Sequence, residues 1–336
     1  MKFKIFLYLC FLSTSVLAQI KTSELYGSWI ATRVTYLSGE ELPDENILKY
    51  TYVKYNFKPT DKMFYSGVYY NLGWEMFFNV VGDRINVSSS AGTVVNVFKV
   101  LDLKKSTLVI VQSTAQGFTD PMAIKYTFTR EEILQDAMPL TNADVFRING
   151  TDTLYQSGQK IYAQFSGPDF SDYISANMGK REISVKSGEL LVSFIVDKDG
   201  VADSLKILQG INPKYDKAYV EIFNSAKHKW SPARINGKPV SVLMQQEKKY
   251  FTSDKAIPSY FEGNKANLAY NNGNYELALH YYNLALGSKP DDKEQLYKRG
   301  ICKQKLGNLN GACEDWRKVK ALGGEEANAL LEKFCK

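Results

Sequence analysis

Residues that could carry out acid–base, nucleophilic or metal chemistry are few in this chain, and their spacing forms no motif. The chain has two histidines, His228 and His280, and neither stands beside a serine or a cysteine. A structural zinc site needs four ligands held together, and we find no nucleophile elbow or phosphate-binding loop. These observations predict a protein that is not an enzyme, with no catalytic residue, no metal and no cofactor.

A short acidic stretch at residues 197–200 (DKDG) suggests calcium. A calcium-binding helix–loop–helix that began at Asp197 would need Gly at its sixth position and Glu at its twelfth. Those positions hold Ala202 and Leu208, so the motif fails. Asp-Gly between two apolar runs is instead typical of a β-hairpin turn, in which Gly supplies the positive φ angle. We therefore predict a hairpin at this point.

The chain has the composition of an ordinary globular protein, since 44% of its 336 residues are hydrophobic and 23% are charged. This length exceeds one small core, so two or three domains are expected. The formal net charge of +6, spread over the chain, is too weak to predict binding to nucleic acid or to an anionic membrane surface.

The first 18 residues are typical of a cleaved signal peptide. Lys2 and Lys4 precede an apolar run at 5–12. Ala18, directly before Gln19, is a small residue of the kind found at signal-peptide cleavage sites. The apolar run is shorter than the roughly 20 residues that cross a bilayer. The mature chain is therefore expected to be exported and to have no transmembrane span.

Residues 19–134 contain many short apolar runs separated by turns. Residues 50–57 alternate with a period of two, and turn residues at 58–61 (KPTD) and 117–121 (GFTDP) separate neighbouring runs. Short strands divided by turn chemistry predict an antiparallel β-barrel or sandwich. A barrel of about eight strands is either filled by its own side chains or holds one small apolar ligand, and both alternatives remain open.

The two ends of this region resemble the lipocalin-like families. Residues 27–29 (GSW) lie near its beginning, and residues 107–111 (TLVIV) lie near its end. The resemblance implies that Trp29 closes the base of the barrel and that Arg130, from the last strand, covers it.

The middle third of the chain has the order strand, turn, strand, helix, loop and strand. The runs VSFIVDKDG (192–200) and KWSPARINGKPV (229–240) stand at its two ends. In this order they resemble the C-terminal domain of TonB, a module of the Gram-negative periplasm that docks onto outer-membrane receptors. The resemblance implies an α+β domain over 161–252 with a three-stranded antiparallel sheet and two helices. Residues 135–160 are interpreted as a linker that contains short strands.

The same resemblance implies that the last strand of this sheet binds a partner. Unpaired N–H and C=O groups on an exposed edge can recruit an extended peptide as an added strand. Pro239 fits an edge strand, because proline cannot donate a ladder hydrogen bond. The alternative is that the edge is covered within the protein. The predicted partner-binding residues are Val240, Ser241, Val242, Leu243, Met244 and Gln245.

Residues 258–336 have a helical pattern that repeats. Gly273 and Asn274 recur 34 residues later as Gly307 and Asn308, which resembles tetratricopeptide repeats. The resemblance implies two helix pairs and a capping helix over 325–336. Since at least three repeats are usually needed for independent stability, we expect these helices to pack on the neighbouring domain.

The first helices of the two repeats would line a groove. The expected groove positions are Asn267, Tyr270, Asn271, Tyr297, Ile301 and Gln304. Asn267 occupies a place used in peptide-carboxylate clamps, but Gly263 stands where such a clamp needs lysine. The clamp is therefore incomplete, and side chains that meet only solvent or the sheet are the favoured alternative.

Removing Cys10 with the leader leaves three cysteines, all in the helical segment. An oxidising compartment favours a disulfide. Because Cys313 is expected to face the following helix, the predicted pair is Cys313–Cys335. Cys302–Cys313 is the alternative.

The sequence thus predicts a multi-domain α+β protein of the periplasm, with the outer membrane as a candidate site of association. Its expected function is to bind protein partners of the cell envelope, with outer-membrane receptor peptides as candidates. One alternative is a TonB-type energy transducer, which the cleavable leader and the absence of a proline-rich spacer argue against. Another is a carrier that uses the barrel for a small apolar ligand. The predicted regions are 1–18 (signal peptide), 19–134 (barrel), 135–160 (linker), 161–252 (TonB-like domain) and 258–336 (repeats).

Overall fold

The fold is described from a computed structural model that covers residues 20–149, 152–185, 188–250 and 260–335. The signal peptide expected at 1–18 lies outside the described residues. Contacts divide the chain into two units. The first extends to residue 51 and includes 55–64 and 75–130, and the second contains 52–54, 65–74 and everything from residue 131 onward.

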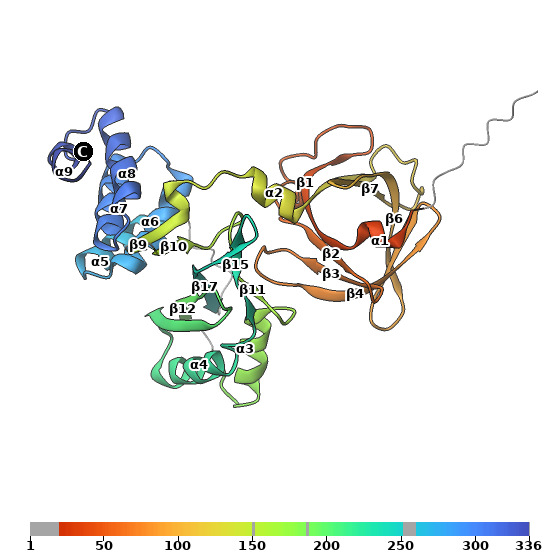
Figure 1. Cartoon of the computed structure of the whole chain (residues 1–336), viewed down its shortest axis with the longest axis horizontal. Coiled ribbons are helices and arrows are strands. Elements are labelled where there is room, and N and C mark those ends of the chain that lie inside the picture. Colours follow the sequence, from red (N-terminus) through yellow and green to blue (C-terminus); the bar gives the residue numbers. More distant parts are fainter. Residues whose placement is uncertain (1–19, 150–151, 186–187, 251–259, 336) are drawn as a thin grey trace, which may run out of the picture. The chain divides into compact units, whose positions relative to one another are not determined.

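Eight antiparallel strands close into a barrel, as the sequence predicts (Figure 1). The barrel closes where the first and last strands pair, with Trp29 opposite Arg130. A short helix α1 (Thr22–Leu25) precedes the strands, and a 3-10 turn (Ile47–Lys49) follows the first of them. The strands are β1 (Gly27–Tyr36), β2 (Lys54–Lys58), β3 (Lys62–Ser66), β4 (Trp74–Val81), β5 (Arg84–Ser88), β6 (Val94–Leu103), β7 (Thr107–Gln112) and β8 (Ile124–Arg130).

Trp29 and Arg130 pack together at one end of the barrel. Trp29 is fully buried, and its indole N–H donates to the carbonyl of Leu25 at 2.7 Å. The guanidinium of Arg130 lies 4.2 Å from the centre of the Trp29 ring and donates to the carbonyl of Tyr26 at 2.7 Å. The expected contact between Trp29 and Arg130 is therefore present.

Aromatic side chains occupy the barrel interior. Tyr55 stacks on Phe128 with ring centres 5.0 Å apart, and Phe57 meets Phe78 edge to face at 4.9 Å. All four rings are buried, as is Phe98 beside Tyr55. This packing supports the alternative in which the barrel is filled by its own side chains.

The sheet of the second unit has five strands in the order β13-β12-β17-β10-β9. The expected three antiparallel strands are present as its β13, β12 and β17, but the segment interpreted as a linker adds two more. β10 pairs with β17 in parallel and with β9 in antiparallel orientation. Residues 135–160 are therefore not a linker. The strands are β9 (Val145–Asn149), β10 (Asp152–Gln156), β12 (Gly188–Val196), β13 (Ala202–Gln209) and β17 (Val242–Tyr250).

The turn between β12 and β13 is the hairpin predicted at residues 197–200. One carboxylate oxygen of Asp197 accepts the N–H groups of Asp199 and Val201 at 2.9 and 2.8 Å. Gly200 has a φ of 78°, and a Cβ there would lie 2.5 Å from the carbonyl oxygen of Trp230. Glycine is thus required both by the backbone conformation and by the close approach.

Two helices cover one face of the sheet, α3 (Phe170–Gly179) and α4 (Pro213–Ser225). Each begins at a side-chain cap, because Asp169 accepts the N–H of Asp172 and Asn212 accepts that of Tyr215. Trp230 is a buried core residue, with its ring 5.3 Å from that of Phe194. Helix α2 (Glu131–Ala137) and four short strands complete this region, β11 (Gln164–Phe165), β14 (Trp230–Ser231), β15 (Ala233–Ile235) and β16 (Lys238–Val240).

The C-terminal helices form two antiparallel pairs and a terminal helix. Asn274 and Asn308, 34 residues apart, cap the second helix of each pair by accepting the N–H groups of Leu277 and Gly311. At Gly300 an added Cβ would meet the Trp316 ring at 2.4 Å, so glycine permits the close approach of α7 and α8. The helices are α5 (Tyr260–Asn271), α6 (Tyr275–Ser288), α7 (Lys293–Lys305), α8 (Leu309–Ala321) and α9 (Asn328–Phe334).

Helix α6 packs on the face of the sheet opposite to α3 and α4. The buried carboxylate of Glu276 accepts from Ser193 and from Lys206, each at 2.9 Å. The prediction that the helices pack on the neighbouring domain is therefore confirmed. The sheet lies between two helical layers (Figure 1).

Cys313 and Cys335 form a disulfide, with their Cα atoms 5.6 Å apart. This is the predicted pair. Cys302 is a free thiol and is buried, and burial raises its pKa to about 12.

Candidate functional site

The first half of β17 is paired on both sides, which corrects the predicted binding edge. Along one side β17 pairs with β12, in a ladder that begins with Val242 opposite Val196. Along the other side Tyr155 donates to the carbonyl of Ser241 at 3.1 Å, and Ser157 donates to that of Leu243 at 3.0 Å. The reason is that β10 fills the place expected to be open.

The six predicted edge residues therefore have different environments. Val242, Leu243 and Met244 are buried, with exposed fractions of 0, 4 and 2%. Val240 belongs to β16 and pairs with Ala233 of β15. Ser241 contributes its carbonyl to β10. Of the predicted set, Gln245 alone lies beyond the end of β10.

The second half of β17 has a free edge among the described residues. Main-chain groups alternate in direction along a strand, and those of Leu243 point toward β10. The N–H and C=O groups of Gln245, Glu247 and Lys249 consequently point to the same side, where β10 has ended. No hydrogen bond joins them to any residue that the structure describes. This free half-edge, residues 245–249, spans roughly 17 Å.

A small cavity beside the free half-edge lies on the α3–α4 side of the sheet. Its volume is about 100 Å³, and tyrosines and residues 246–248 and 250 of β17 are among the residues that line it. The Tyr219 hydroxyl donates to Gln246 at 3.0 Å, and the hydroxyls of Tyr215 and Tyr250 are 2.9 Å apart. Burial raises the pKa of Tyr219, which keeps this hydroxyl protonated at neutral pH.

Charged residues line the other side of the free half-edge, toward α5 and α6. Glu189 of β12 accepts a hydrogen bond from Lys265 of α5 at 3.1 Å and lies 3.5 Å from Lys249. Lys249 in turn lies 2.7 Å from Glu247. Burial alone would raise the pKa of Glu189, but its hydrogen bonds with Glu247 and Lys265 and the charge of Lys265 bring it to about 2. Burial also raises the pKa of Glu247, and the nearby Glu189 adds to this.

His280 of α6 belongs to the same cluster. Burial and then the charge of Lys249 lower its pKa to about 4. Its Nε2 atom is buried and has no hydrogen-bond partner among the described residues. The imidazole is therefore neutral at neutral pH.

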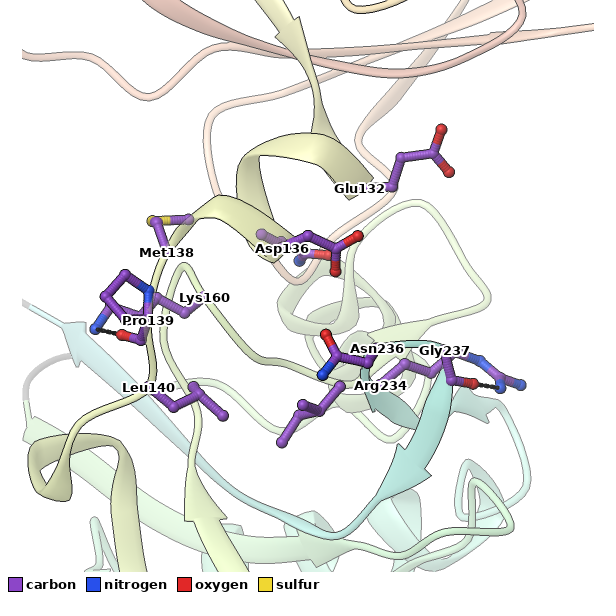
Figure 2. Close-up of a pocket in the computed structure, with 11 residues that line it drawn as sticks. Glu132, Asp136, Met138, Pro139, Leu140, Lys160, Arg234, Asn236 and Gly237 are labelled. Carbon is purple, nitrogen blue, oxygen red and sulfur yellow. Dashed lines mark hydrogen bonds between the residues drawn. The ribbon is translucent and has the colours of Figure 1, made fainter.

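A larger cavity of about 620 Å³ lies between α2, residues 138–140 and the β15–β16 turn (Figure 2). Glu132 and Asp136 stand on its α2 side. The charged ends of Lys160 and Arg234 do not pair with them, because Lys160 donates to the carbonyl of Pro139 at 3.0 Å and Arg234 to that of Gly237 at 2.8 Å. The cavity has polar and apolar walls but no paired acid and base.

The predicted groove residues have different environments. The Asn267 side-chain oxygen accepts from Tyr282 at 2.7 Å and from Lys298 at 2.9 Å, so it is already satisfied. Tyr270 is half-buried with its ring 5.9 Å from that of Tyr275. Asn271 is exposed, and Tyr297, Ile301 and Gln304 are half-buried.

The charged cluster at Glu189, Lys265 and His280 was not predicted from the sequence. Its members come from three elements far apart in the chain. One local signal in the sequence points to it. Glu189 lies on the same face of the sheet as Leu191 of its own strand, and Glu247 and Lys249 lie on the same face as Leu243 of theirs. The charged residues therefore mark a polar end on a face that is otherwise apolar.

No protein-family model matches this chain, and no curated protein matches its sequence. Among the described residues, no helix has the length and apolarity needed to cross a bilayer. No group of three or more His, Cys, Asp or Glu side chains within the described ranges could hold a metal ion.

Proposed function

We propose that this protein is an exported, non-enzymatic interaction protein of the cell envelope. Its second unit would bind an extended segment of a partner protein as an added strand along the free half-edge. The observation that carries the proposal is that Gln245, Glu247 and Lys249 direct main-chain groups to one side of β17, where they have no partner among the described residues. Extended peptides bind such edges through main-chain hydrogen bonds, and side-chain cavities provide specificity.

The surroundings of the free half-edge support this proposal. A strand added beside residue 247 would place alternate side chains toward the tyrosine-lined cavity and toward the charged cluster. The resemblances to TonB and to tetratricopeptide repeats favour the same class of function, and the proposed location is the periplasm. The carrier alternative has less support, since the barrel interior is occupied by aromatic rings. The transducer alternative has less support because the sequence has a cleavable type of leader and no proline-rich spacer.

Two substitutions at one position test the proposal. Glu247→Pro removes the outward N–H of residue 247, whereas Glu247→Ala removes the same carboxylate and keeps that N–H. Proline is tolerated on an edge because the lost N–H is not part of a ladder. Partner capture from envelope extracts should be lost with Glu247→Pro and retained with Glu247→Ala.

Thermal unfolding of both variants accompanies this comparison, so that a folding defect is recognised. If both folded variants capture the same partners as the unmodified protein, main-chain pairing at this edge is rejected. If both lose them equally, the Glu247 side chain binds the partner rather than the strand edge.

A further inference from the structure

A further small cavity, distinct from the two described above, lies where the β9–β10 hairpin meets α6 and α7, away from the free half-edge. Its volume is about 90 Å³. The residues that line it include two cations and three amides and no carboxylate. These polar lining residues are Gln156, Asn283, Arg299, Lys303 and Asn308. We refer to this cavity as the cationic hollow.

The two cations of the cationic hollow share one carboxylate. Arg299 binds Asp315 with two nitrogens, Nε at 2.9 Å and Nη2 at 2.7 Å. The Nζ atom of Lys303 lies 2.9 Å from the same carboxylate. Asp315 is 4% exposed and does not line the hollow. This group therefore carries one positive charge in excess.

The charge of Glu314 also acts on Lys303, but Glu314 does not line the hollow. Glu314 is exposed and accepts a hydrogen bond from Asn142 at 2.7 Å. Lys303 is 8% exposed, and its burial lowers its pKa although Asp315 acts in the opposite direction. A buried charge without a full partner costs free energy unless a counter-charge joins it.

Donors without a described partner remain on the hollow's lining. A guanidinium has five N–H donors, and the described bonds of Arg299 use three of them, two to Asp315 and one to the side-chain oxygen of Asn283 at 3.1 Å. Because that oxygen accepts from Arg299, the amide NH₂ of Asn283 is available to donate. The Asn308 amide already donates to the carbonyl of Val145, and Lys303 also donates to that of Gly311. The donors that the lining offers are therefore the remaining N–H groups of Arg299 and the amide of Asn283, together with the positive charge.

We propose that the cationic hollow binds one small oxyanion, either a carboxylate or inorganic phosphate. The volume limits the occupant to a single group of this size, and charge-assisted N–H donors are the groups that bind such anions most strongly. This site is independent of the free half-edge, so either proposal can fail without the other.

Thermal unfolding of the full mature chain in phosphate, acetate or chloride at equal ionic strength tests the proposal. Phosphate or acetate should raise the melting temperature in a saturable manner beyond the effect of chloride. The anion that acts distinguishes phosphate from carboxylate recognition. Titration calorimetry with the same anion gives its dissociation constant.

Lys303→Met removes one cation and leaves Arg299 paired one to one with Asp315, so the anion's affinity should fall by about tenfold or more. Lys298→Met removes a lysine from the same helix outside the hollow and should have no such effect. If Lys303→Met does not fold, Asn283→Leu serves, since it removes an exposed amide that lines the hollow. Equal melting temperatures in all three anions, or an anion effect that survives in the folded hollow variant, would overturn the proposal.

Discussion

Tyr155 of β10 and Val242 of β17 are partners in a parallel ladder. This pairing covers the first half of β17 and leaves the main-chain groups of Gln245, Glu247 and Lys249 without a described partner. The part of the sheet that we propose to accept a partner strand is therefore the C-terminal half of β17. There the strand lies between a tyrosine-lined cavity and a partly exposed charged cluster.

His280 should make the protein less stable as the pH falls below about 6.5. Burial lowers its folded-state pKa to about 4, from the usual 6.5 of a histidine side chain. A group with a depressed folded pKa favours protonation in the unfolded state, so stability is lost between these values by at most about 1.4 kcal/mol per pH unit. Urea unfolding at several pH values measures this slope.

Between pH 6.5 and pH 4.5 the change in stability reports on His280 more than on the acidic residues. The stabilising contribution of Glu189 falls only below 4.5, toward its folded pKa of about 2. Glu247, whose pKa is raised, acts against His280 near the lower end of the window. His280→Phe keeps a ring beside Tyr281 and should flatten the slope. Identical slopes in His280→Phe and the unmodified protein would contradict the assignment.

The packing of α6 on the sheet depends on Glu276. Glu276→Gln removes the charge that Lys206 and Ser193 contact, and the change should lower the free energy of unfolding by about 1–3 kcal/mol. Glu294→Gln is the matched control, because Glu294 is 69% exposed and its described ion pair is with Lys298 in its own helix. That control should change stability by less than about 0.5 kcal/mol. Equal effects in urea titrations would show that Glu276 is not an interface residue.

Much of the fold could be predicted because its signals are local. Period-two alternation and turn chemistry indicated the barrel, and Asp197 and Gly200 marked the hairpin. The place of β10 could not be predicted, because strand pairing uses main-chain groups that leave no trace in residue type. Tyr155 and Val242 are also far apart in the sequence. The charged cluster was missed for the same reason, since Glu189 and Lys265 meet only after the helices pack.

The two glycines Gly300 and Gly287 should respond to alanine with opposite signs. At Gly300 the added Cβ would lie 2.4 Å from the buried Trp316 ring, so overpacking should cost about 1–3 kcal/mol. At Gly287 no atom lies within 4 Å of the added Cβ, and alanine should stabilise α6 by up to about 1 kcal/mol through helix propensity. Melting temperatures decide the matter, and a tolerated Gly300→Ala would contradict the close packing of α7 on α8.

The Cys313–Cys335 disulfide should stabilise the last two helices. It joins residues 22 positions apart, for which loop-closure entropy predicts about 3 kcal/mol. Reductant should lower the melting temperature of the unmodified protein and leave that of a Cys313→Ala, Cys335→Ala double variant unchanged. A reductant effect of equal size in the double variant would assign it to another cysteine.

The free half-edge is the central claim, and backbone amide hydrogen exchange measured residue by residue in the isolated mature protein tests it most directly. The N–H groups of Gln246 and Lys248 bond to β12 and should be protected. Those of Gln245, Glu247 and Lys249 should exchange at nearly unprotected rates. Protection of these three amides equal to that of Gln246 and Lys248 would show that the protein covers this edge itself and would contradict the account.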